Sequence, residues 1–328
     1  MIIEYISIAL AVFLITVILE KLIIPILKSH KVGQRILEIG PRWHKDKAGT
    51  PTMGGICFIM AILVVMAIAS IILAVNGRSE KLIPLALALG LATLNGMIGF
   101  FDDYTKLVKK QNEGFSAKTK IILQSIVAAV YLVAMSLTNN INTSLHIPFT
   151  SVWLELGAFY YAFAFILIIG FVNSVNLTDG IDGLASSVTL VVGIFFSVAA
   201  FTFDNIVLAF IGASLVGATA GFLVYNFYPA RVFMGDTGSL FLGGLVVGAT
   251  FALDEPMIIF LVGIIYLTEA ASDIIQVGVY KLSGRKKRVF KMAPIHHHFE
   301  QCNWSENKIV AVFSLVTLIF CIVAYFGL

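Results

Sequence analysis

Five short polar stretches carry residues with which this 328-residue chain could do chemistry. They are HKDKAGTPTMGG (44–55), FFDDYTK (100–106), NSVNLTDGIDG (173–183), NFYPARVFMGDTGS (226–239) and GRKKRVFKMAPIHHHFE (284–300). The second, third and fourth stretches contain five aspartates: Asp102, Asp103, Asp179, Asp182 and Asp236. Carboxylates bind hard cations, above all Mg²⁺, which typically takes one or two of them together with substrate phosphates. Because Lys47, Lys118 and Lys120 suit phosphate oxygens as point charges, the pattern predicts phosphoryl-transfer chemistry.

Three consecutive histidines in the last stretch, His296, His297 and His298, form a different kind of candidate site. Adjacent side chains diverge by about 100° in a helix and alternate faces in a strand, so three adjacent imidazoles do not readily close on one ion. We predict that His296 and His297 contact phosphate or sugar oxygens of a substrate, with Glu300 orienting one of them. His298 is predicted to pack or to orient the loop. The alternative, a solvated basic loop attracted to anionic lipid, explains GRKKRVFK but not PIHHHFE.

The composition places these stretches in a membrane protein. The chain is 59% hydrophobic and only 12% charged, whereas a soluble domain carries about 25% charged residues. Long apolar runs without strand alternation favour helices over a closed barrel, the two structures that satisfy every backbone polar group in lipid. We predict an all-α polytopic membrane protein with a single integral-membrane domain over residues 1–328. The ten predicted transmembrane helices are 3–27, 53–75, 82–101, 120–137, 154–173, 184–203, 206–227, 238–253, 257–278 and 307–327.

Lysine and arginine are distributed unevenly among the connections between these helices. All of them except Lys21, Arg78 and Lys81 fall in or beside the odd-numbered connections. Because cytoplasmic loops carry an excess of these residues, we predict that the odd-numbered connections are cytosolic and that both termini are extracytoplasmic. All five polar stretches then lie on the cytosolic face, where we predict the active-site cleft. The outer connection at 138–152 is predicted to be a covering loop or a short hairpin.

Helix capping is a structural alternative for the aspartates, because carboxylates favour helix N-termini. Asp182 precedes the sixth predicted helix and Asp236 precedes the eighth, so both fit this alternative. Asp102 and Asp103 follow the third predicted helix, where the helix dipole disfavours anions. That pair therefore points more strongly to function.

Other function classes fit the sequence less well than phosphoryl transfer does. A P-loop enzyme is excluded because the chain has no G-x-x-x-x-G-K-[ST] stretch, and the H-E-x-x-H spacing of zinc hydrolases is also absent. A cation-coupled transporter remains an alternative, since such proteins place carboxylates within a helical bundle near the midplane. Glu269 and Asp273, one turn apart on the ninth predicted helix, are its best support. We expect them near the cytosolic end of that helix or at a break in it.

Together, HKDKAGTPTMGG, FFDDYTK, NLTDGIDG, FMGDTGS and PIHHHFE resemble the motifs of the polyprenyl-phosphate N-acetylhexosamine-1-phosphate transferases, over essentially the whole chain. GTPTMGG and PIHHHFE more narrowly resemble the bacterial branch that uses UDP-MurNAc-pentapeptide. The resemblance implies transfer of phospho-MurNAc-pentapeptide from UDP-MurNAc-pentapeptide to undecaprenyl phosphate, giving lipid I and UMP in peptidoglycan synthesis, with Mg²⁺ as cofactor. It also implies a multi-pass homodimer of the bacterial plasma membrane, with its active site facing the cytoplasm and no nucleic-acid partner. A UDP-GlcNAc transferase for another surface polymer is the rival within the family.

The same resemblance assigns roles to individual residues. Asp236 matches the metal ligand, and Asp102 and Asp103 match essential acidic residues. His296 and His297 match residues that line the active site. The residues that match the uridine pocket are Lys47, Gly180, Ile181, Asp182, Asn226 and Phe233. The residues that complete the polar cleft by the same matching are Thr52, Asn176, Asp179 and Lys120. We group Lys120 with the catalytic residues, and His298 and Glu300 with the substrate-binding ones.

Two reaction paths are open for such a transfer. A phosphate monoester has a second pKa of about 6, so the lipid phosphate is largely a dianion at pH 7 and hardly needs a strong base. This favours direct attack on the β-phosphorus of the nucleotide sugar, with Asp102 positioning or deprotonating the lipid phosphate. The rival is a two-step path through an aspartyl-phosphate on Asp102 or Asp103.

Overall fold

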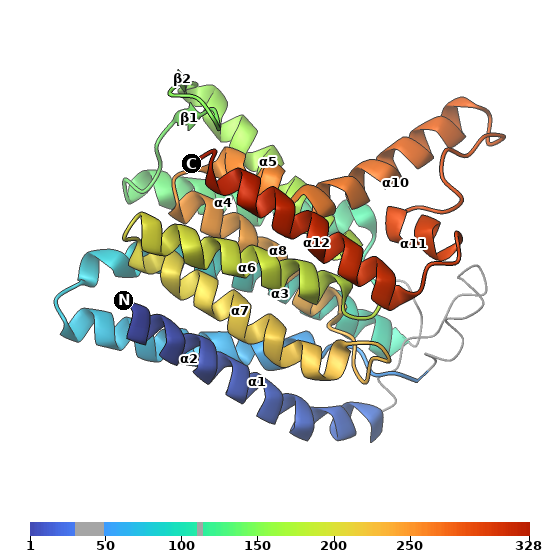
Figure 1. The fold of residues 1–328 in the computed structure, drawn as a ribbon, viewed down its shortest axis with the longest axis horizontal. Helices are drawn as coiled ribbons and strands as arrows, with labels where there is room; N and C mark the ends of the chain where they lie inside the picture. The colour runs from blue at the N-terminus through green and yellow to red at the C-terminus, as the bar shows by residue number, and fades with distance from the viewer. Residues whose placement is uncertain (30–48, 110–113) are drawn as a thin grey trace.

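A computed structural model shows a bundle of long helices (Figure 1) and describes residues 1–29, 49–109 and 114–328. The elements, in chain order, are α1 (Ile2–Ser29), α2 (Gly55–Val75), η2 (Ser79–Lys81), α3 (Leu82–Lys109), α4 (Ala117–Leu137), β1 (Ser144–His146), β2 (Trp153–Glu155), α5 (Ala158–Thr178), α6 (Leu184–Thr202), α7 (Ile206–Asn226), α8 (Gly235–Ala252), η3 (Pro256–Ile258), α9 (Ile259–Val262), α10 (Ile264–Leu282), α11 (Ile295–Glu300) and α12 (Glu306–Tyr325). Within the described ranges, eight helices are long and apolar enough to cross a membrane, and a bent pair would make a ninth. The prediction of an all-helical, polytopic membrane protein is confirmed, with eight or nine candidate spans.

The predicted helix at 238–253 corresponds to α8, which is not among these eight candidates. Its first turn is polar, with the sequence GDTGS, and every residue from Thr237 to Phe251 is buried. α8 packs mainly against α3 and α5. A helix that faces protein on all sides needs fewer large apolar side chains than one that faces lipid, which explains its lower hydropathy.

The predicted continuous helix at 257–278 is wrong, because the chain bends by 79° between the segments Pro256–Val262 and Ile264–Leu282. The break lies at Gly263. A Cβ atom there would lie 2.6 Å from the Ile259 carbonyl oxygen and 2.8 Å from the Phe171 ring. Only a glycine therefore fits this bend, after which α10 projects away from the other helices (Figure 1).

Small residues set the distance between α3 and α8. We call them the glycine seam, which consists of Gly96 and Gly99 on α3 and Gly244 and Gly248 on α8. A Cβ atom on Gly244 would lie 2.7 Å from the Ala92 Cα atom, and one on Gly99 would overlap the backbone of Asp236. Close packing of small residues is a main source of helix association in lipid, where lipid tails are as apolar as side chains. The glycine seam therefore allows close packing of α3 and α8 along most of their shared length, which brings the second half of α3 against the first turn of α8.

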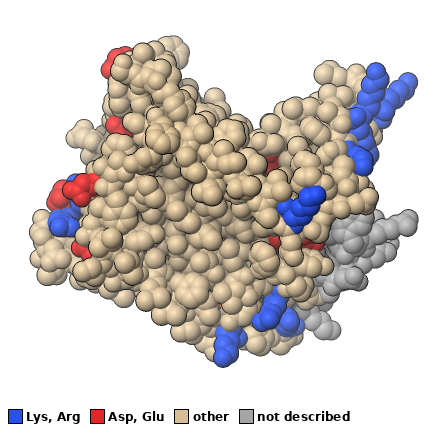
Figure 2. All heavy atoms as spheres, in the orientation of Figure 1, with Lys and Arg blue, Asp and Glu red and all other residues tan. Residues whose placement is uncertain are grey.

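The connection between α4 and α5 contains the predicted short hairpin. β1 and β2 pair in antiparallel register, with Leu145 opposite Leu154. Figure 2 shows a broad band without charged side chains across the visible face of the bundle. Lys and Arg gather at the end of the molecule where α10 projects, and charges of both signs lie at the opposite end. Such a band between two charged ends is typical of a protein that spans a bilayer.

Candidate active site

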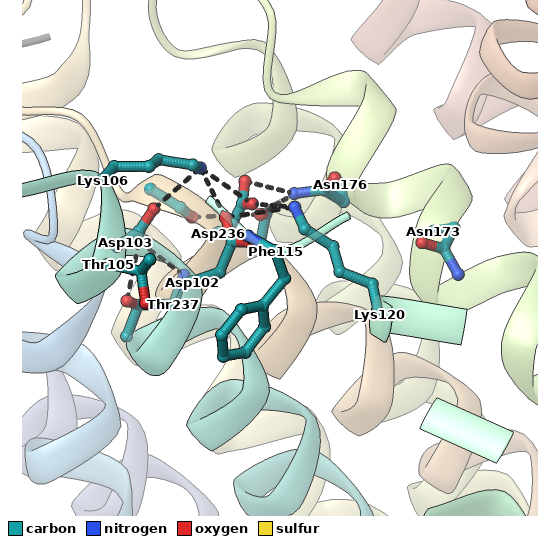
Figure 3. A network of polar contacts seen from close by, with 12 residues as sticks. Asp102, Asp103, Thr105, Lys106, Phe115, Lys120, Asn173, Asn176, Asp236 and Thr237 are labelled. Atoms are coloured by element: carbon teal, nitrogen blue, oxygen red, sulfur yellow. Dashed lines mark hydrogen bonds and ion pairs between the residues drawn. The ribbon is translucent and has the colours of Figure 1, made fainter. Parts of the chain in front are cut away.

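Three of the predicted aspartates meet where α3 and α8 pack together (Figure 3). α3 continues to Lys109, so Asp102 and Asp103 lie within the helix and do not follow it as predicted. Asp236 lies in the first turn of α8. One carboxylate oxygen from each of the three residues lies within 4.8 Å of the others. We call Asp102, Asp103 and Asp236 the aspartate cluster.

Two lysines form ion pairs with the aspartate cluster and offset part of its negative charge. Lys106 Nζ lies 2.7 Å from Asp102 Oδ2, 3.2 Å from Asp103 Oδ1 and 3.0 Å from Asp236 Oδ2. Lys120 Nζ, at the start of α4, lies 2.5 Å from Asp236 Oδ2 and 3.2 Å from Asp102 Oδ2. The sequence interpretation included Lys120 but missed Lys106. Its spacing of three and four residues from the two aspartates would have indicated the contact, had the helix been extended past residue 101.

Backbone groups hold Asp102 and Asp103 in place. The amide of Phe115 donates a 2.6 Å hydrogen bond to Asp102 Oδ1. Asp103 Oδ2 accepts bonds from the Thr237 amide at 2.9 Å and from the Thr237 hydroxyl at 2.8 Å. Both aspartates are buried, with exposures of 0% and 3%. These two carboxylates are therefore fixed by the fold before any substrate arrives.

Asp236 is the most accessible carboxylate of the cluster. Its side chain is 18% exposed, and Asp236 Oδ1 accepts a 3.0 Å hydrogen bond from the amide of Asn176 on α5. The Asn176 amide also donates to Ser239 at 2.7 Å. Three carboxylates within reach of one ion form the oxygen donor set that Mg²⁺ prefers. The aspartate cluster could therefore hold a divalent metal, with Asp236 on its open side.

Asp179 and Gly180 connect the aspartate cluster to the histidines. Asp179 follows the last residue of α5 and is half-buried. Burial, together with the negative charges of Asp236, Asp103 and Asp182, raises the pKa of its carboxyl group to about 8. A Cβ atom on Gly180 would overlap Nε2 of His296. The 179–180 turn therefore lies next to the imidazole and within electrostatic range of the cluster.

His296 is oriented by a glutamate from the broken helix. Its imidazole is 1% exposed, and its Nδ1 atom lies 3.0 Å from Glu269 Oε2. Its Nε2 atom points at Gly180 and has no hydrogen-bond partner among the described residues. Sequence reasoning attached Glu269 to the transporter alternative and expected it near a helix end or at a break, and the bend at Gly263 does precede it by six residues. It did not predict the contact with His296. The contact with His296 removes the best support for that alternative.

The other two histidines have partners within their own segment. His297 Nδ1 lies 2.6 Å from Glu300 Oε2, so the predicted contact between Glu300 and a histidine is present. His298 Nδ1 accepts a 3.1 Å hydrogen bond from the Lys291 amide. This bond ties α11 to the basic segment before it, as expected for a residue that orients the loop.

Asn226 and Asp182 join two loops at the edge of the site. Asn226 is buried, accepts a 3.2 Å bond from the Gly183 amide and donates a 3.0 Å bond to the Val232 carbonyl. Asp182 Oδ2 accepts a 2.8 Å bond from the Ala230 amide. Neither residue caps a helix through its side chain in these contacts. Both hold the 180–183 and 226–233 loops together.

The remaining predicted residues surround these loops. The Phe233 amide donates a 2.8 Å bond to the Pro51 carbonyl, which joins the TPTMGG segment to the loop before α8. A Cβ atom on Gly235 would lie 2.9 Å from Thr52 Oγ1, so Thr52 lies beside the aspartate cluster. Ile181 is buried with 5% exposure. Lys47 lies outside the described residues.

Comparisons with known proteins agree on one family. The model of glycosyl transferase family 4 matches residues 84–254, and signature 1 of phospho-N-acetylmuramoyl-pentapeptide-transferase matches residues 47–59. The chain is 46% identical to the phospho-N-acetylmuramoyl-pentapeptide-transferase of Clostridium perfringens (strain 13 / Type A) over 316 residues, 96% of each chain. It is 42% identical to the enzyme of that name from Staphylococcus carnosus (strain TM300) over 313 residues, 95% of each chain.

Proposed function

Because this chain belongs to the phospho-N-acetylmuramoyl-pentapeptide-transferase family, we propose that it transfers phospho-MurNAc-pentapeptide from UDP-MurNAc-pentapeptide to undecaprenyl phosphate. The products are lipid I, the membrane-bound precursor of peptidoglycan, and UMP. The observation that carries this proposal is the aspartate cluster, with Lys106 and Lys120, at one end of the α3–α8 pair. The reaction joins two anions, so neutralising and positioning charge is the main task of the protein.

The two lysines are proposed to hold the reacting phosphates. Both contact Asp236 Oδ2, and both are partly exposed, at 26% and 22%. When substrate binds, each ammonium group can exchange a carboxylate for a phosphate oxygen without a large movement. Such preorganised cations stabilise the charge that develops on the transferring phosphoryl group.

Mg²⁺ is the proposed cofactor, and Asp236 is its proposed ligand. The donor set fits, because hard carboxylate oxygens lie within reach of one ion and Asp236 is the one most open to solvent. When bound, the ion would act as a Lewis acid toward phosphate oxygens. Asn176, bonded to Asp236 Oδ1, orients this carboxylate.

Direct attack by the lipid phosphate is the proposed path. Asp102 is 0% exposed and lies between two lysines and the Phe115 amide. A carboxylate in this position suits orientation of the lipid phosphate, or removal of its proton, better than attack on phosphorus. Isolation of a phosphorylated enzyme after incubation with the nucleotide substrate alone would instead support an aspartyl-phosphate on Asp102 or Asp103.

His296 is proposed to contact a phosphate or sugar oxygen of the nucleotide substrate through its Nε2 atom. Glu269 accepts from the Nδ1 side of the ring, which leaves Nε2 to face Gly180 and the substrate. His297, paired with Glu300, is proposed to line the same cleft. The uridine is proposed to bind where the 180–183 and 226–233 loops meet, in contact with Ile181, Asp182 and Phe233.

We further propose that the protein spans the membrane ten times, with both termini extracytoplasmic. It would form a single integral-membrane domain and assemble as a homodimer. α8 and the bent α9–α10 pair would supply the ninth and tenth spans. The aspartate cluster would then face the cytoplasm of a bacterial plasma membrane. Cysteines introduced at Arg285 and at Asn140 should react with an impermeant thiol reagent from opposite sides of the membrane; labelling of both from one side would contradict this topology.

The direct test offers the purified protein two nucleotide sugars in separate reactions with undecaprenyl phosphate and Mg²⁺. UMP release with UDP-MurNAc-pentapeptide, and not with UDP-GlcNAc, is the expected result. Release with UDP-GlcNAc alone would identify the rival GlcNAc-1-phosphate transferase. A reaction without the lipid acceptor controls for hydrolysis of the nucleotide sugar.

A further inference from the structure

A cavity of about 280 Å³ lies far from the aspartate cluster. Its walls include Leu87 of α3, Tyr131 of α4 and Phe251 of α8. The same three helices carry the aspartate cluster and Lys120. A helix rises by about 1.5 Å per residue, so the separation of Phe251 from Asp236 along α8 is roughly 22 Å. The cavity is therefore at the other end of the helices and is not part of the transferase site.

The rim of this cavity is polar and acidic. It includes three asparagines of the loop after α4, namely Asn139, Asn140 and Asn142, together with Asp254. Asp254 is exposed, and its Oδ2 atom lies 3.4 Å from the Asn142 amide nitrogen. In the part of the chain that the structure describes, no Lys or Arg forms an ion pair with Asp254. The Asn142 side-chain oxygen already accepts a 3.1 Å hydrogen bond from the Ser144 amide. The rim thus presents the Asp254 carboxylate together with the side-chain amides of Asn139 and Asn140, groups of a kind that can accept hydrogen bonds from a ligand.

The floor of the cavity is apolar. Tyr131 and Phe251 pack edge to face, with ring centroids 5.7 Å apart, and Leu87 and Met135 lie beside them. Ligand pockets usually measure roughly 300–1,000 Å³, so this cavity is at the small end of the range. It is too small for a nucleotide sugar and suits a headgroup with a short apolar segment. The ligand that fits both the rim and the floor is a cation with an apolar part.

We propose that this cavity binds a primary ammonium headgroup carried by a lipid of the adjacent leaflet, with the carboxylate of Asp254 as its counterion. A primary ammonium has three N–H donors, which match the carboxylate and the asparagine carbonyls of the rim. The cavity lies at the ends of α3, α4 and α8, because Pro84 is in the first turn of α3 while Asn139 and Asp254 follow the last residues of α4 and α8. The ends of helices that span a bilayer lie at the level of the lipid headgroups. Partial desolvation of the Asp254 carboxyl group raises its pKa, and a bound ammonium would favour its ionised form.

The test measures binding of dihexanoyl-phosphatidylethanolamine to the full-length detergent-solubilised protein by isothermal titration calorimetry. Asp254→Asn should weaken binding about fivefold, as expected for loss of a partly exposed ion pair. Ala252→Leu, which narrows the cavity, should also weaken it. The matched control is Asp204→Asn, since Asp204 is likewise exposed and has a positive φ of 48° in a turn between helices. That control should bind like the unmodified chain.

Four outcomes would overturn the proposal. Asp254→Asn could bind as tightly as the unmodified chain, or the control could lose as much affinity as Asp254→Asn. Dihexanoyl-phosphatidylglycerol, which has no ammonium, could bind equally well. Free ethanolamine could bind as tightly as the lipid, which would remove the lipid from the assignment. Transferase activity and the melting temperature of each variant are measured in parallel to exclude misfolding.

Discussion

The two ends of α3, α4 and α8 carry polar groups in different arrangements. At one end, three carboxylates and two lysines form one coupled network that lies within the helices. At the other end, Asp254 and Glu255 lie in the connection after α8 and meet Asn142 and His146 in separate pairs. The charges are therefore coupled to one another at the aspartate cluster and are largely independent at the opposite end. Groups in one network respond together to a substitution, whereas separate pairs respond almost independently.

The two ends of the helices also differ in how a substitution should affect function. Removing one partner from a buried charge network leaves the other charges uncompensated, which is strongly unfavourable. A partly exposed pair contributes little, and its loss is local. Substitutions at the aspartate cluster should therefore change turnover, and substitutions at the opposite end should change local stability while leaving turnover intact.

The largest effect is expected for Asp236→Asn. Loss of the open carboxylate removes the proposed Mg²⁺ ligand and one acceptor of both lysines, so turnover should fall by about 10³-fold or more. UMP release at increasing Mg²⁺ concentrations measures it. Asp254→Asn, at the other end of α8, is the control and should retain near-normal turnover. Near-normal Mg²⁺-dependent activity of Asp236→Asn would remove Asp236 from the metal site.

A smaller loss is expected for Lys120→Met, because Lys106 remains beside the carboxylates. We expect turnover to fall by about 10²-fold, as is typical when one preorganised charge partner is removed. Lys118→Met is the matched control, since Lys118 lies on the same helix but is exposed. Equal losses in the two variants would show that general positive charge, and not the contact with Asp236, matters.

Breaking the Glu269–His296 pair should have an effect equal to or smaller than that of Lys120→Met. His296→Ala should lower turnover by about 10²-fold, and Glu269→Gln by about tenfold, because the imidazole would remain but lose its orientation. His298→Ala is the control within α11. The pH profile of turnover should shift in Glu269→Gln. If His296→Ala leaves catalysis intact, the three histidines have only a structural role.

The smallest effect on turnover is expected for His146→Gln in the hairpin formed by β1 and β2. His146 Nδ1 lies 3.0 Å from Glu255 Oε1, and its Nε2 lies 2.7 Å from the Thr150 carbonyl oxygen, so a doubly protonated ring satisfies both acceptors. Burial alone would lower the pKa of His146, but Thr150 and Glu255 outweigh it and raise the pKa above its ordinary value of 6.5.

The sign of the pH effect follows from that shift. Stabilisation by His146 is complete below pH 6.5 and is lost as the pH rises through the raised pKa of the folded state. Hydrogen exchange of residues 144–155 should therefore speed up as the pH rises above about 6.5 and through the raised pKa, beyond the intrinsic increase, in the unmodified chain only. The same pH dependence in His146→Gln would show that another group controls the hairpin.

The residues of the site could be predicted from the sequence because charge and hydropathy act over short segments. Asp102, Asp103, Asp236 and Lys120 were expected on one face, since a carboxylate at the centre of a transmembrane helix is costly. They do meet at one end of the bundle. The contact between Glu300 and a histidine followed from local spacing alone.

Other features could not be predicted, because hydropathy indicates where lipid ends and not where a helix ends. α3 continues through DDYTK to Lys109, which turned Asp102 and Asp103 from residues after a helix into residues on it. The break at Gly263 lies within an apolar run, so its position could not be read from hydropathy, although a break near Glu269 was one of two expectations. The contact between Glu269 and His296 joins residues distant in sequence, so it escaped prediction.

The glycine seam has a consequence for how the enzyme could be assembled. A slip of α3 along α8 by one turn would move Asp102 and Asp103 by about 5.4 Å, beyond hydrogen-bond reach of Thr237 and away from Asp236. Gly99, which faces the Asp236 backbone, leaves no room for any other residue at that contact. Catalytic activity thus depends on the correct alignment of α3 along α8. A newly inserted chain is expected to become active only once α3 and α8 have packed in their native register.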